Sequence, residues 1–596
     1  MASTTATSTG ISPPHGRPSS LPDQNEKGPV PASSTADNKP TAYTKDEETT
    51  LPPYASTPSS PSLKPEYDHT HRRLKPRHIQ LIGIGGTIGT VLFVQIGHAL
   101  IESGPGSLFI AFSFCPSPSF VLNARVKEDA QSTKAPPPQR DLPPKTDDST
   151  LTGGMAEMVT YLPISSPFVR FAGRYVDDAF GVAAGYNFFV FEAMLVPFEI
   201  VACNLIINFW SDVVPTGAII AIVIVLYGVL NIFAVKWYGE SEFWLALGKV
   251  ILIVGMIFYT IVTMLGGNPL HDRFGFRYWH APGAFAEYYK TGSLGRFMGF
   301  LQALIQAYYV SMAAGEAENP RVVMPRAYNG VFFRLTAFFV LGSLAVGINV
   351  PYNDPEMAAA LNSGVQGAAA SPYVLAMVRL RIHVLPDIVN AMILTAAFSA
   401  GNSYVYCASR SLYGLALERK APRFLTKCTK NGVPVYCVLA VLLLSLISFL
   451  QVSNGAAVVL QWFVNLVTAS QLINFSVMSF TFICWKKACD VQGFSRDLLP
   501  HKAFWQPFSA YYALVFCFIM TFMGGYTVFL PGQWDIPTFF FSYTMIGVFP
   551  ILFFGWKFIK KTKWRKPHEV DLYSGVDEID DYTRDYVPRP PRRKVL

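Results

Sequence analysis

Long apolar stretches alternate with polar ones from His78 almost to the end of this chain. Each stretch has roughly 17–25 residues, which is enough to cross about 30 Å of hydrocarbon as a helix. The pattern predicts an all-α polytopic membrane protein. The clearest predicted spans are Ile79–Ile101, Gly185–Phe209, Thr216–Val235, Phe243–Leu265, Phe297–Ala314, Val331–Val350, Ile388–Leu417, Tyr436–Leu450, Ala456–Trp485, Ala510–Leu530 and Thr538–Phe558.

A twelfth transmembrane helix is indicated by two apolar pieces, Ser107–Cys115 and Met155–Leu162, each too short to cross a bilayer alone. Between them lies Pro116–Gly154, a polar, proline-containing stretch typical of a flexible linker. Its backbone groups would lack hydrogen-bond partners in lipid. Either a long loop leaves the membrane here, or the segment is foreign to the mature protein, such as unspliced sequence in the gene model. We favour the second interpretation.

The two ends of the chain have the composition of tails. Residues 1–70 are rich in Pro, Ser and Thr and poor in large apolar side chains, so they bury too little surface to offset the entropy of ordering. A small folded domain is the alternative. Residues 567–596 include an acidic, proline-containing stretch and are expected to form a second tail. The transmembrane domain is therefore predicted to occupy residues 71–566.

Basic residues are concentrated in every second connection, which by the positive-inside rule predicts that both termini are cytosolic. This alternation requires an even number of crossings and hence the interrupted twelfth helix. Two predicted outer loops also carry arginines, at 273 and 277 and at 379 and 381. The predicted cytosolic clusters include Arg170 and Arg174, Arg321 and Arg326, Arg419–Lys430 and Lys560–Lys566.

Composition supports the membrane assignment and excludes other classes. Charged residues make up only 15% of the 596 residues, against roughly 25% in soluble proteins, and the mean hydropathy is +0.29. This disfavours a soluble multidomain enzyme. The net charge of +8 (48 − 40) is explained by the loop charges, so no nucleic-acid partner is expected. The eight cysteines form no CxxC pair and mostly fall in apolar runs, so a disulfide framework or zinc ribbon is not expected. No other pattern predicts a metal site or a cofactor.

The first span contains a glycine-rich stretch, Gly83–Thr90. Glycine in a helix interior costs about 1 kcal/mol relative to alanine, so this stretch should weaken or unwind the helix. Unwound backbone inside a bilayer persists only where it lines a cavity or polar site, and its N–H groups would suit a carboxylate. The alternative is close packing of helices through small residues.

Three charged residues fall inside predicted spans: Glu192 and Glu199, seven residues apart on one helix face, and Lys249. Because each would cost a few kcal/mol facing lipid, they should face the bundle interior or water. The functional hypothesis is proton coupling or substitution for an ion, with Glu199 the deeper candidate. The alternatives are a structural ion pair, or a lysine that extends to the interface.

Small polar residues in the eighth span, Ser399–Tyr404, either line a pathway or hydrogen-bond to neighbouring helices. The sixth span ends in Gly315–Arg321, where proline and polar residues terminate the helix. No HExxH, GxSxG or Walker pattern is apparent, and an enzyme is not expected.

Taken together, several blocks resemble the yeast amino acid transporter family, the fungal amino-acid permeases of the amino acid–polyamine–organocation superfamily. The resemblance runs from about His71 to Val587, apart from Pro116–Gly154. It implies twelve helices, with helices one to five and six to ten forming a LeuT-like inverted repeat whose first and sixth helices are broken at the substrate site. The blocks are His71–His78 leading into Gly85–Thr90, Met155–Val159, Val196–Ile200, Gly239–Trp244 and Gly315–Arg321.

The resemblance also implies site residues. The backbone of Gly86–Val91, including Gly89 and Thr90, would hold the substrate carboxylate, and the backbone around Tyr308, Tyr309 and Ser311 would receive its ammonium group and side chain. Lys249 would match a lysine that replaces a coupling sodium ion in some superfamily members. Val91 stands where the family usually has glycine, and Gln302–Tyr309 departs from the family's sixth-helix break.

The function implied is a plasma-membrane secondary transporter that imports amino acids or related amines with protons by alternating access. Glu199 and Lys249 are the proton-coupling candidates. The alternative is a permease-like nutrient sensor that binds substrate and signals without transport.

Overall fold

A computed structural model of the chain describes residues 89–114, 150–162, 167–211, 213–233, 235–307, 337–363, 371–429, 432–496, 499, 502, 506–577 and 579. All of them belong to the second of two units, Pro65–Leu596. The predictions for Gly83–Ile88, for most of Pro116–Gly154, for Tyr308–Arg321 and for residues 1–70 lie outside the described residues.

The described part of the chain is helical and contains no strand. Its longer helices are α2 (Ile96–Phe114), α4 (Thr150–Tyr161), α5 (Pro167–Tyr175), α6 (Asp178–Ile207), α7 (Thr216–Phe233), α8 (Val235–Met264), α9 (Gly292–Ala307), α11 (Pro355–Ser363), α12 (Pro372–Arg379), α13 (Leu385–Leu417), α14 (Val435–Ser445), α16 (Ala456–Val491), α17 (Phe508–Met523) and α18 (Ile536–Lys560). Short turns are η1 (Val91–Gln95), η2 (Trp279–Gly283), η3 (Arg423–Thr426), η4 (Leu446–Leu450), α15 (Gln451–Asn454) and η6 (Tyr526–Phe529).

Seven of these helical segments are long and apolar enough to cross a membrane, which confirms seven of the predicted spans. Two further predicted spans coincide with shorter apolar helices, Ala337–Asn349 and α17. The full count of twelve and the inverted repeat remain predictions. The seven segments are Asp178–Ile207, Thr216–Phe233, Ser241–Met264, Leu385–Leu417, Val435–Asn454, Ala456–Val491 and Ile536–Lys560.

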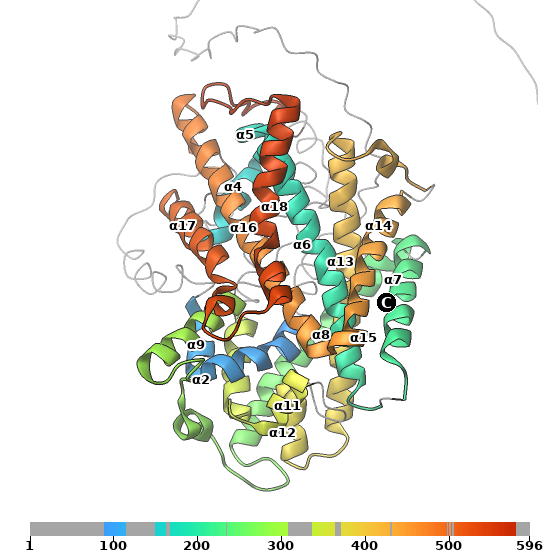
Figure 1. Ribbon diagram of the computed structural model, residues 1–596, viewed down its shortest axis with the longest axis vertical. Helices are drawn as coiled ribbons and strands as arrows, with labels where there is room; N and C mark the ends of the chain where they lie inside the picture. Colours follow the sequence, from blue (N-terminus) through green and yellow to red (C-terminus); the bar gives the residue numbers. More distant parts are fainter. Residues whose placement is uncertain are drawn as a thin grey trace, which may run out of the picture. The chain divides into compact units, whose positions relative to one another are not determined.

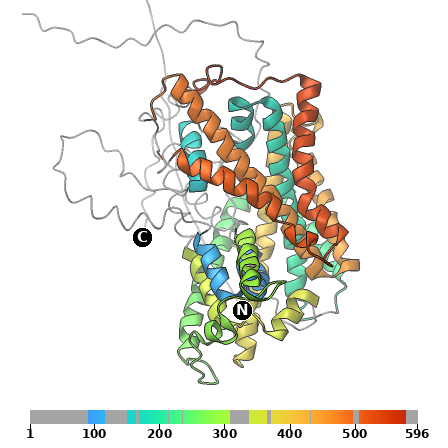
Figure 2. The ribbon, with the colours of Figure 1, turned by 60° about the vertical axis from the view of Figure 1, so that its left-hand side comes forward.

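Helix α6 lies at the centre of the bundle, against α13 and α16 on different sides (Figures 1 and 2). Its most apolar window is 89% buried, whereas that of α18 is only 11% buried. A helix that is apolar all round belongs in an interior, and one that leaves its apolar side chains uncovered suits contact with lipid. Burial therefore separates core helices from peripheral ones.

The start of α6 shows how local sequence fixes a helix end. Asp177 caps the helix, and its carboxylate accepts a hydrogen bond of 3.0 Å from the Ala179 N–H. Lys557 of α18 also donates to Asp177. Because the last turns of α13 and α18 meet α5 and the first turn of α6 here, we call this the α5 end of the bundle.

Helix α2 is divided at Gly104, whose φ of +77° is a left-handed conformation that favours glycine. The chain before and after this bend pairs with the segment that follows η2. Gly106 N–H donates to Ala284 O at 2.6 Å, and Ala286 N–H donates to Ser103 O at 3.1 Å. The bend therefore joins the end of the first predicted span to the connection between α8 and α9.

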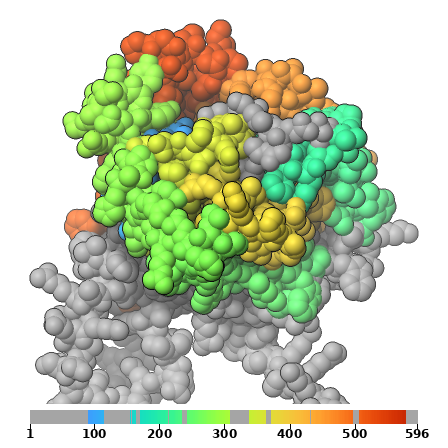
Figure 3. Space-filling model, turned by 90° about the horizontal axis from the view of Figure 1, so that it is seen from below, coloured from blue at the N-terminus to red at the C-terminus, as the bar shows by residue number. Residues whose placement is uncertain are grey.

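The opposite end of the bundle carries α11, α12 and the connection from α8 to α9, and we call it the α12 end (Figure 3). It also includes the turn after α6, since Trp210 Nε1 donates to Asp387 near the start of α13 at 2.8 Å. Helices α6 and α13 thus run antiparallel between the two ends.

The chain that follows α18 packs back onto the α5 end. Val570 and Leu572 are buried, at 4% and 1% exposure. The Gln492 amide donates to the carbonyls of Pro567 and Val570 at 2.9 and 2.7 Å, and the Tyr161 hydroxyl donates to Leu572 O at 3.2 Å. The first part of the predicted tail therefore lies against α4 and the end of α16.

Candidate functional site

The most deeply buried polar contact among the predicted site residues joins Thr90 to Glu199. The Thr90 hydroxyl donates a hydrogen bond to Glu199 Oε2, and the two residues are 0% and 1% exposed. A hydrogen bond to a charged acceptor is stronger than one between neutral groups. The contact ties α6 to Thr90, the residue directly before η1.

Gly89 allows this contact by its lack of a side chain. A Cβ at position 89 would lie 3.0 Å from Glu199 Oε1 and 3.1 Å from the Cβ of Ala400 in α13. Both contacts are tighter than ordinary van der Waals distances, so a larger residue would displace the carboxylate or the helix. Three elements therefore meet closely at Gly89, Glu199 and Ala400.

Lys249 lies in the same region of the bundle, on α8. Its ammonium nitrogen is 4.0 Å from Glu242 Oε1, and both side chains are 1% exposed. It also interacts electrostatically with Glu199. Lys249 does not extend to the surface, so the alternative of a lysine at the membrane interface is wrong. The buried ammonium group of Lys249 therefore interacts with two buried carboxylates, those of Glu242 and Glu199.

Sequence reasoning missed Glu242 as the partner of Lys249, although it precedes Lys249 by seven residues and so lies on the same face of the helix. The Ser399 hydroxyl of α13 donates to both oxygens of Glu242, at 3.0 and 3.2 Å. The seven-residue spacing within α8 was therefore a sequence signal for the Glu242–Lys249 pair. The Ser399 contact crosses between helices and has no signal in the local sequence.

Helix α13 presents small polar residues to its neighbours at this level. Asn402 accepts a hydrogen bond of 2.8 Å from Asn231 of α7. A Cβ at Gly401 would lie 2.0 Å from the hydroxyl oxygen of Tyr227 on α7. Of the two interpretations of Ser399–Tyr404, hydrogen bonding to neighbouring helices is observed for Ser399 and Asn402.

The remaining predicted site residues are only partly described. Val91 starts the buried turn η1 and is 8% exposed. Glu192 is buried on α6, on the same face as Glu199. Gly86, Tyr308, Tyr309 and Ser311 lie outside the described residues. The structure thus brings together Gly89, Thr90, Glu199 and Lys249.

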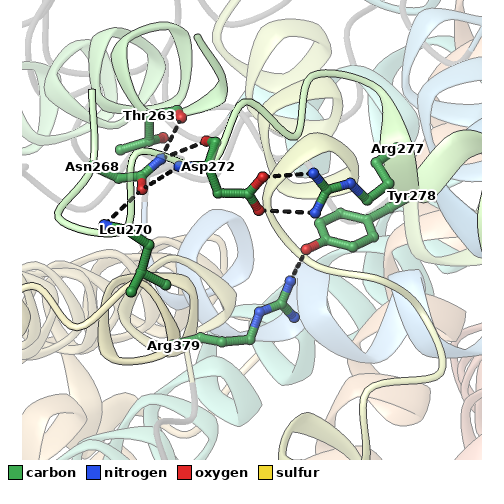
Figure 4. A network of polar contacts seen from close by, with 7 residues as sticks. All are labelled: Thr263, Asn268, Leu270, Asp272, Arg277, Tyr278 and Arg379. Atoms are coloured by element: carbon green, nitrogen blue, oxygen red, sulfur yellow. Dashed lines mark hydrogen bonds and ion pairs between the residues drawn. The ribbon is translucent and has the colours of Figure 1, made fainter. Parts of the chain in front are cut away.

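A separate polar network at the α12 end accounts for two of the unexpected arginines (Figure 4). Arg277 pairs with Asp272 through two bonds of 2.8 and 2.6 Å. Arg379 pairs with Asp354 at 2.9 Å and also donates to the Tyr278 hydroxyl. Both arginines are therefore paired with neighbouring carboxylates.

At the α5 end, charged side chains line an open cleft with a volume of about 390 Å³. Arg170 bonds to Glu418 at 2.8 Å, and Lys420 lies 2.8 Å from Glu418 and 3.2 Å from Asp178. The predicted cytosolic charges of α5 are therefore held in a network with the end of α13. No group of three or more His, Cys, Asp or Glu side chains suited to a metal ion occurs in the described ranges.

Comparison with known proteins identifies the family. The amino acid permease family model matches residues 152–569. The chain is 44% identical over 532 residues to the general amino acid permease AGP2 of Saccharomyces cerevisiae, covering 87% of this chain and 84% of that protein. It is 39% identical over 538 residues to the proline-specific permease of Emericella nidulans, covering 88% and 92%.

A third relative is the dicarboxylic amino acid permease of Saccharomyces cerevisiae, 34% identical over 90% of this chain and 86% of that protein. Among solved structures, the chain is similar to the manganese transporter of Eremococcus coleocola, with a TM-score of 0.46 and 11% identity over 81% of this chain and 94% of that one. The relatives are permeases and not enzymes. The family match and the long apolar helices lead to one conclusion: this chain belongs to the amino acid permease family and is a multi-pass membrane protein.

Proposed function

We propose that the protein imports amino acids or related amines across the plasma membrane by proton symport, with alternating access to a site in the middle of the bundle. The observation that carries the proposal is the buried Thr90–Glu199 hydrogen bond beside Lys249. It joins a group that can hold a proton to the backbone at which the carboxylate of the substrate is expected to bind.

The coupling follows from the chemistry of these three side chains. When Glu199 is ionised, it accepts the Thr90 hydrogen bond and shares the charge of Lys249 with Glu242. When Glu199 takes up a proton, its attraction for Lys249 is lost and its carboxyl group becomes a donor. Since Thr90 adjoins Gly89 and Val91, either change reaches the backbone proposed to bind substrate.

The substrate site proposed here consists of the backbone of Gly86, Gly89, Thr90 and Val91 for the carboxylate. Tyr308, Tyr309 and Ser311 are proposed for the ammonium group and side chain. Relatives include permeases described as general, proline-specific and dicarboxylic, so a common carboxylate site with a variable side-chain pocket fits the range of substrates in the family. These names describe transporters, and they give no support to the alternative of a sensor without transport.

The test is uptake of a panel of labelled amino acids in a host that lacks its own permeases. We expect uptake that rises as external pH falls and collapses when a protonophore is added. Uptake of a substrate that is insensitive to the protonophore would refute proton symport, and ligand-dependent signalling without flux would favour the sensor.

Two further measurements address the membrane arrangement. Epitopes at both ends of the chain should be labelled only after the plasma membrane is permeabilised; labelling of one end in intact cells would refute cytosolic termini. A chain without residues 116–154 should fold and transport at least as well as the full chain if that segment is foreign. Poorer folding or flux after the excision would refute that interpretation.

Lys249 is tested in a variant that does not leave Glu242, its ion-pair partner, charged and unpaired. Lys249→Ala combined with Glu242→Gln should transport without pH dependence, whereas Glu242→Gln alone should retain it. If the double variant keeps the pH dependence of the unmodified chain, Lys249 has no role in coupling.

A further inference from the structure

Glu192 is a buried carboxylate that the coupling scheme above does not use. It is 4% exposed, and its Oε2 has no hydrogen-bond partner among the described residues. It precedes Glu199 by seven residues, which is two helical turns or about 10.5 Å along α6. The two carboxylates therefore occupy one face of the central helix, with Glu192 nearer the α5 end.

The surroundings of Glu192 differ from those of the other two buried carboxylates. Glu199 accepts from Thr90 and interacts with Lys249, and Glu242 accepts from Ser399 and pairs with Lys249. No ion pair or hydrogen bond among the described residues joins buried Glu192 to a cation. An ionised carboxylate in such a place is costly, so Glu192 is suited to carry a proton.

Tyr404 lies on α13, which packs against α6, and is nearer the α5 end than Ala400, in the direction in which Glu192 lies from Glu199. It is 7% exposed and interacts with both Glu199 and Glu192. It is one helical turn beyond Ala400, the residue that faces Gly89. A phenolic hydroxyl both donates and accepts a hydrogen bond, so it can receive a proton on one side as it releases its own on the other.

The backbone between the two glutamates offers a further acceptor. Pro197 lies inside α6 and has no N–H, so the carbonyl of Ala193 cannot receive its usual helical hydrogen bond. In a membrane helix such a freed carbonyl is satisfied by a neighbouring side chain or an ordered water. This places a polar backbone atom on the stretch of α6 between Glu192 and Glu199.

Several other titratable groups lie near this region and contribute to its pH dependence. Near Glu199 and Tyr404 the described helices present Cys203 of α6, Tyr227 of α7, Glu242 and Lys249 of α8, and Cys407 of α13. From α16 the side chains that reach α6 include the amide of Asn474, which bonds to Asn187. None of these contacts supplies Glu192 with a cation.

We propose that Glu192 is a second proton-carrying carboxylate, which receives the proton of Glu199 by way of Tyr404 and releases it toward the α5 end. In this step the Glu199 carboxyl group gives its proton to the Tyr404 hydroxyl as that hydroxyl gives its own to ionised Glu192. The hydroxyl is unchanged, and one negative charge moves from Glu192 to Glu199. The inference rests on the proposed proton symport. A proton requires a single acceptor oxygen, whereas a bound cation would require several ligands and room for them.

The experiment uses purified full-length protein in liposomes, with labelled L-proline and L-lysine as probes, in two modes. The first mode is net uptake driven by an inward proton gradient, and the second is exchange at equal pH, which requires no net proton release. Glu192→Gln should lower net uptake of both probes by at least about tenfold and leave exchange within about twofold. Glu192→Asp should restore part of the net uptake.

The matched control is Glu157→Gln, the same change at another buried carboxylate that is paired with Arg496. It should leave the ratio of net uptake to exchange unchanged. Equal losses of both modes in Glu192→Gln would indicate a structural role, and a loss confined to L-lysine would indicate a ligand for a cationic side chain; either result overturns the inference. Full net uptake by Glu192→Gln would overturn the role of Glu192 but not proton symport. Net uptake by the unmodified protein that does not depend on the proton gradient would overturn both.

Discussion

The hydroxyl of Thr90 offers the sharpest test of the buried site, because one atom can be changed with little effect on shape. Thr90→Val replaces the hydroxyl with a methyl group and keeps the branched side chain. It leaves Glu199 Oε2 without the donor that it has in the structure, at a place where both residues are almost fully buried. No water at the surface can compensate at such a depth.

The magnitude follows from the nature of the bond. A hydrogen bond to a charged group contributes about 1.5–3 kcal/mol, and an orphaned buried acceptor loses a comparable amount. If the loss of this energy raises the activation free energy of transport by the same amount, the uptake rate falls about 10- to 150-fold, since each 1.36 kcal/mol corresponds to a factor of ten. In a Glu199→Gln background the acceptor is neutral, and the same substitution should cost only about 1 kcal/mol.

The assay measures substrate binding and uptake side by side, so that the Glu199→Gln background remains informative even where flux is low. Thr90→Ser retains the hydroxyl and should retain most of the activity. Thr521→Val is the matched control, because the buried Thr521 hydroxyl donates to Cys517 O of its own helix at 2.7 Å, a bond whose loss leaves no charged group unpaired.

Three results would refute the reasoning about Thr90. Uptake by Thr90→Val equal to that of the unmodified chain would show that the bond does not support transport. An equal loss in Thr521→Val would show a general effect of the substitution. The same cost in the presence and absence of Glu199→Gln would show that the charge of Glu199 is not involved.

Two other predictions concern stability, measured as thermal unfolding in detergent. Gly401→Ala should destabilise the protein by about 1–3 kcal/mol because its Cβ would overlap the buried Tyr227 hydroxyl. Gly547→Ala is the control and should not destabilise it, since no atom lies within 4 Å of the added Cβ. Equal stability of the two variants would contradict the close approach of Gly401 to Tyr227. Burial opposes ionisation of Asp177, yet the bonds from Lys557 and the Ala179 N–H lower its pKa, so its contribution is present above about pH 4 and lost as pH falls through the lowered value. Asp177→Asn should therefore differ from the unmodified chain at pH 6 and converge with it in acid; a constant difference would contradict this assignment.

Hydropathy alone predicted the membrane helices well, but less well their ends. The predicted span Gly185–Phe209 corresponds to α6, which begins seven residues earlier at Asp178. The extra turns contain polar and small residues, and they are helical because Asp177 caps them and α5 packs beside them. A window that averages hydrophobicity cannot include a cap or a neighbouring helix.

Interactions between helices were the part of the site that the sequence could not supply. Lys249 and Glu199 were candidates because charges are rare inside membranes. Their partners Glu242 and Thr90 were not assigned as such, because pairing depends on which faces of α6, α8 and the first span meet. The amphipathic helix α5 was also missed, since its nine residues are too few and too polar to register as a span.

The docked segment after α18 has a practical consequence for where the chain can be cut or joined to another protein. A stop after Lys566 would remove Val570 and Leu572 and uncover the apolar side chains beneath them. It would also leave the Gln492 amide and the Tyr161 hydroxyl without their acceptors. Because Ile579 also packs against this cluster, fluorescent reporters and purification handles belong beyond residue 579, and deletions in this region should start after it.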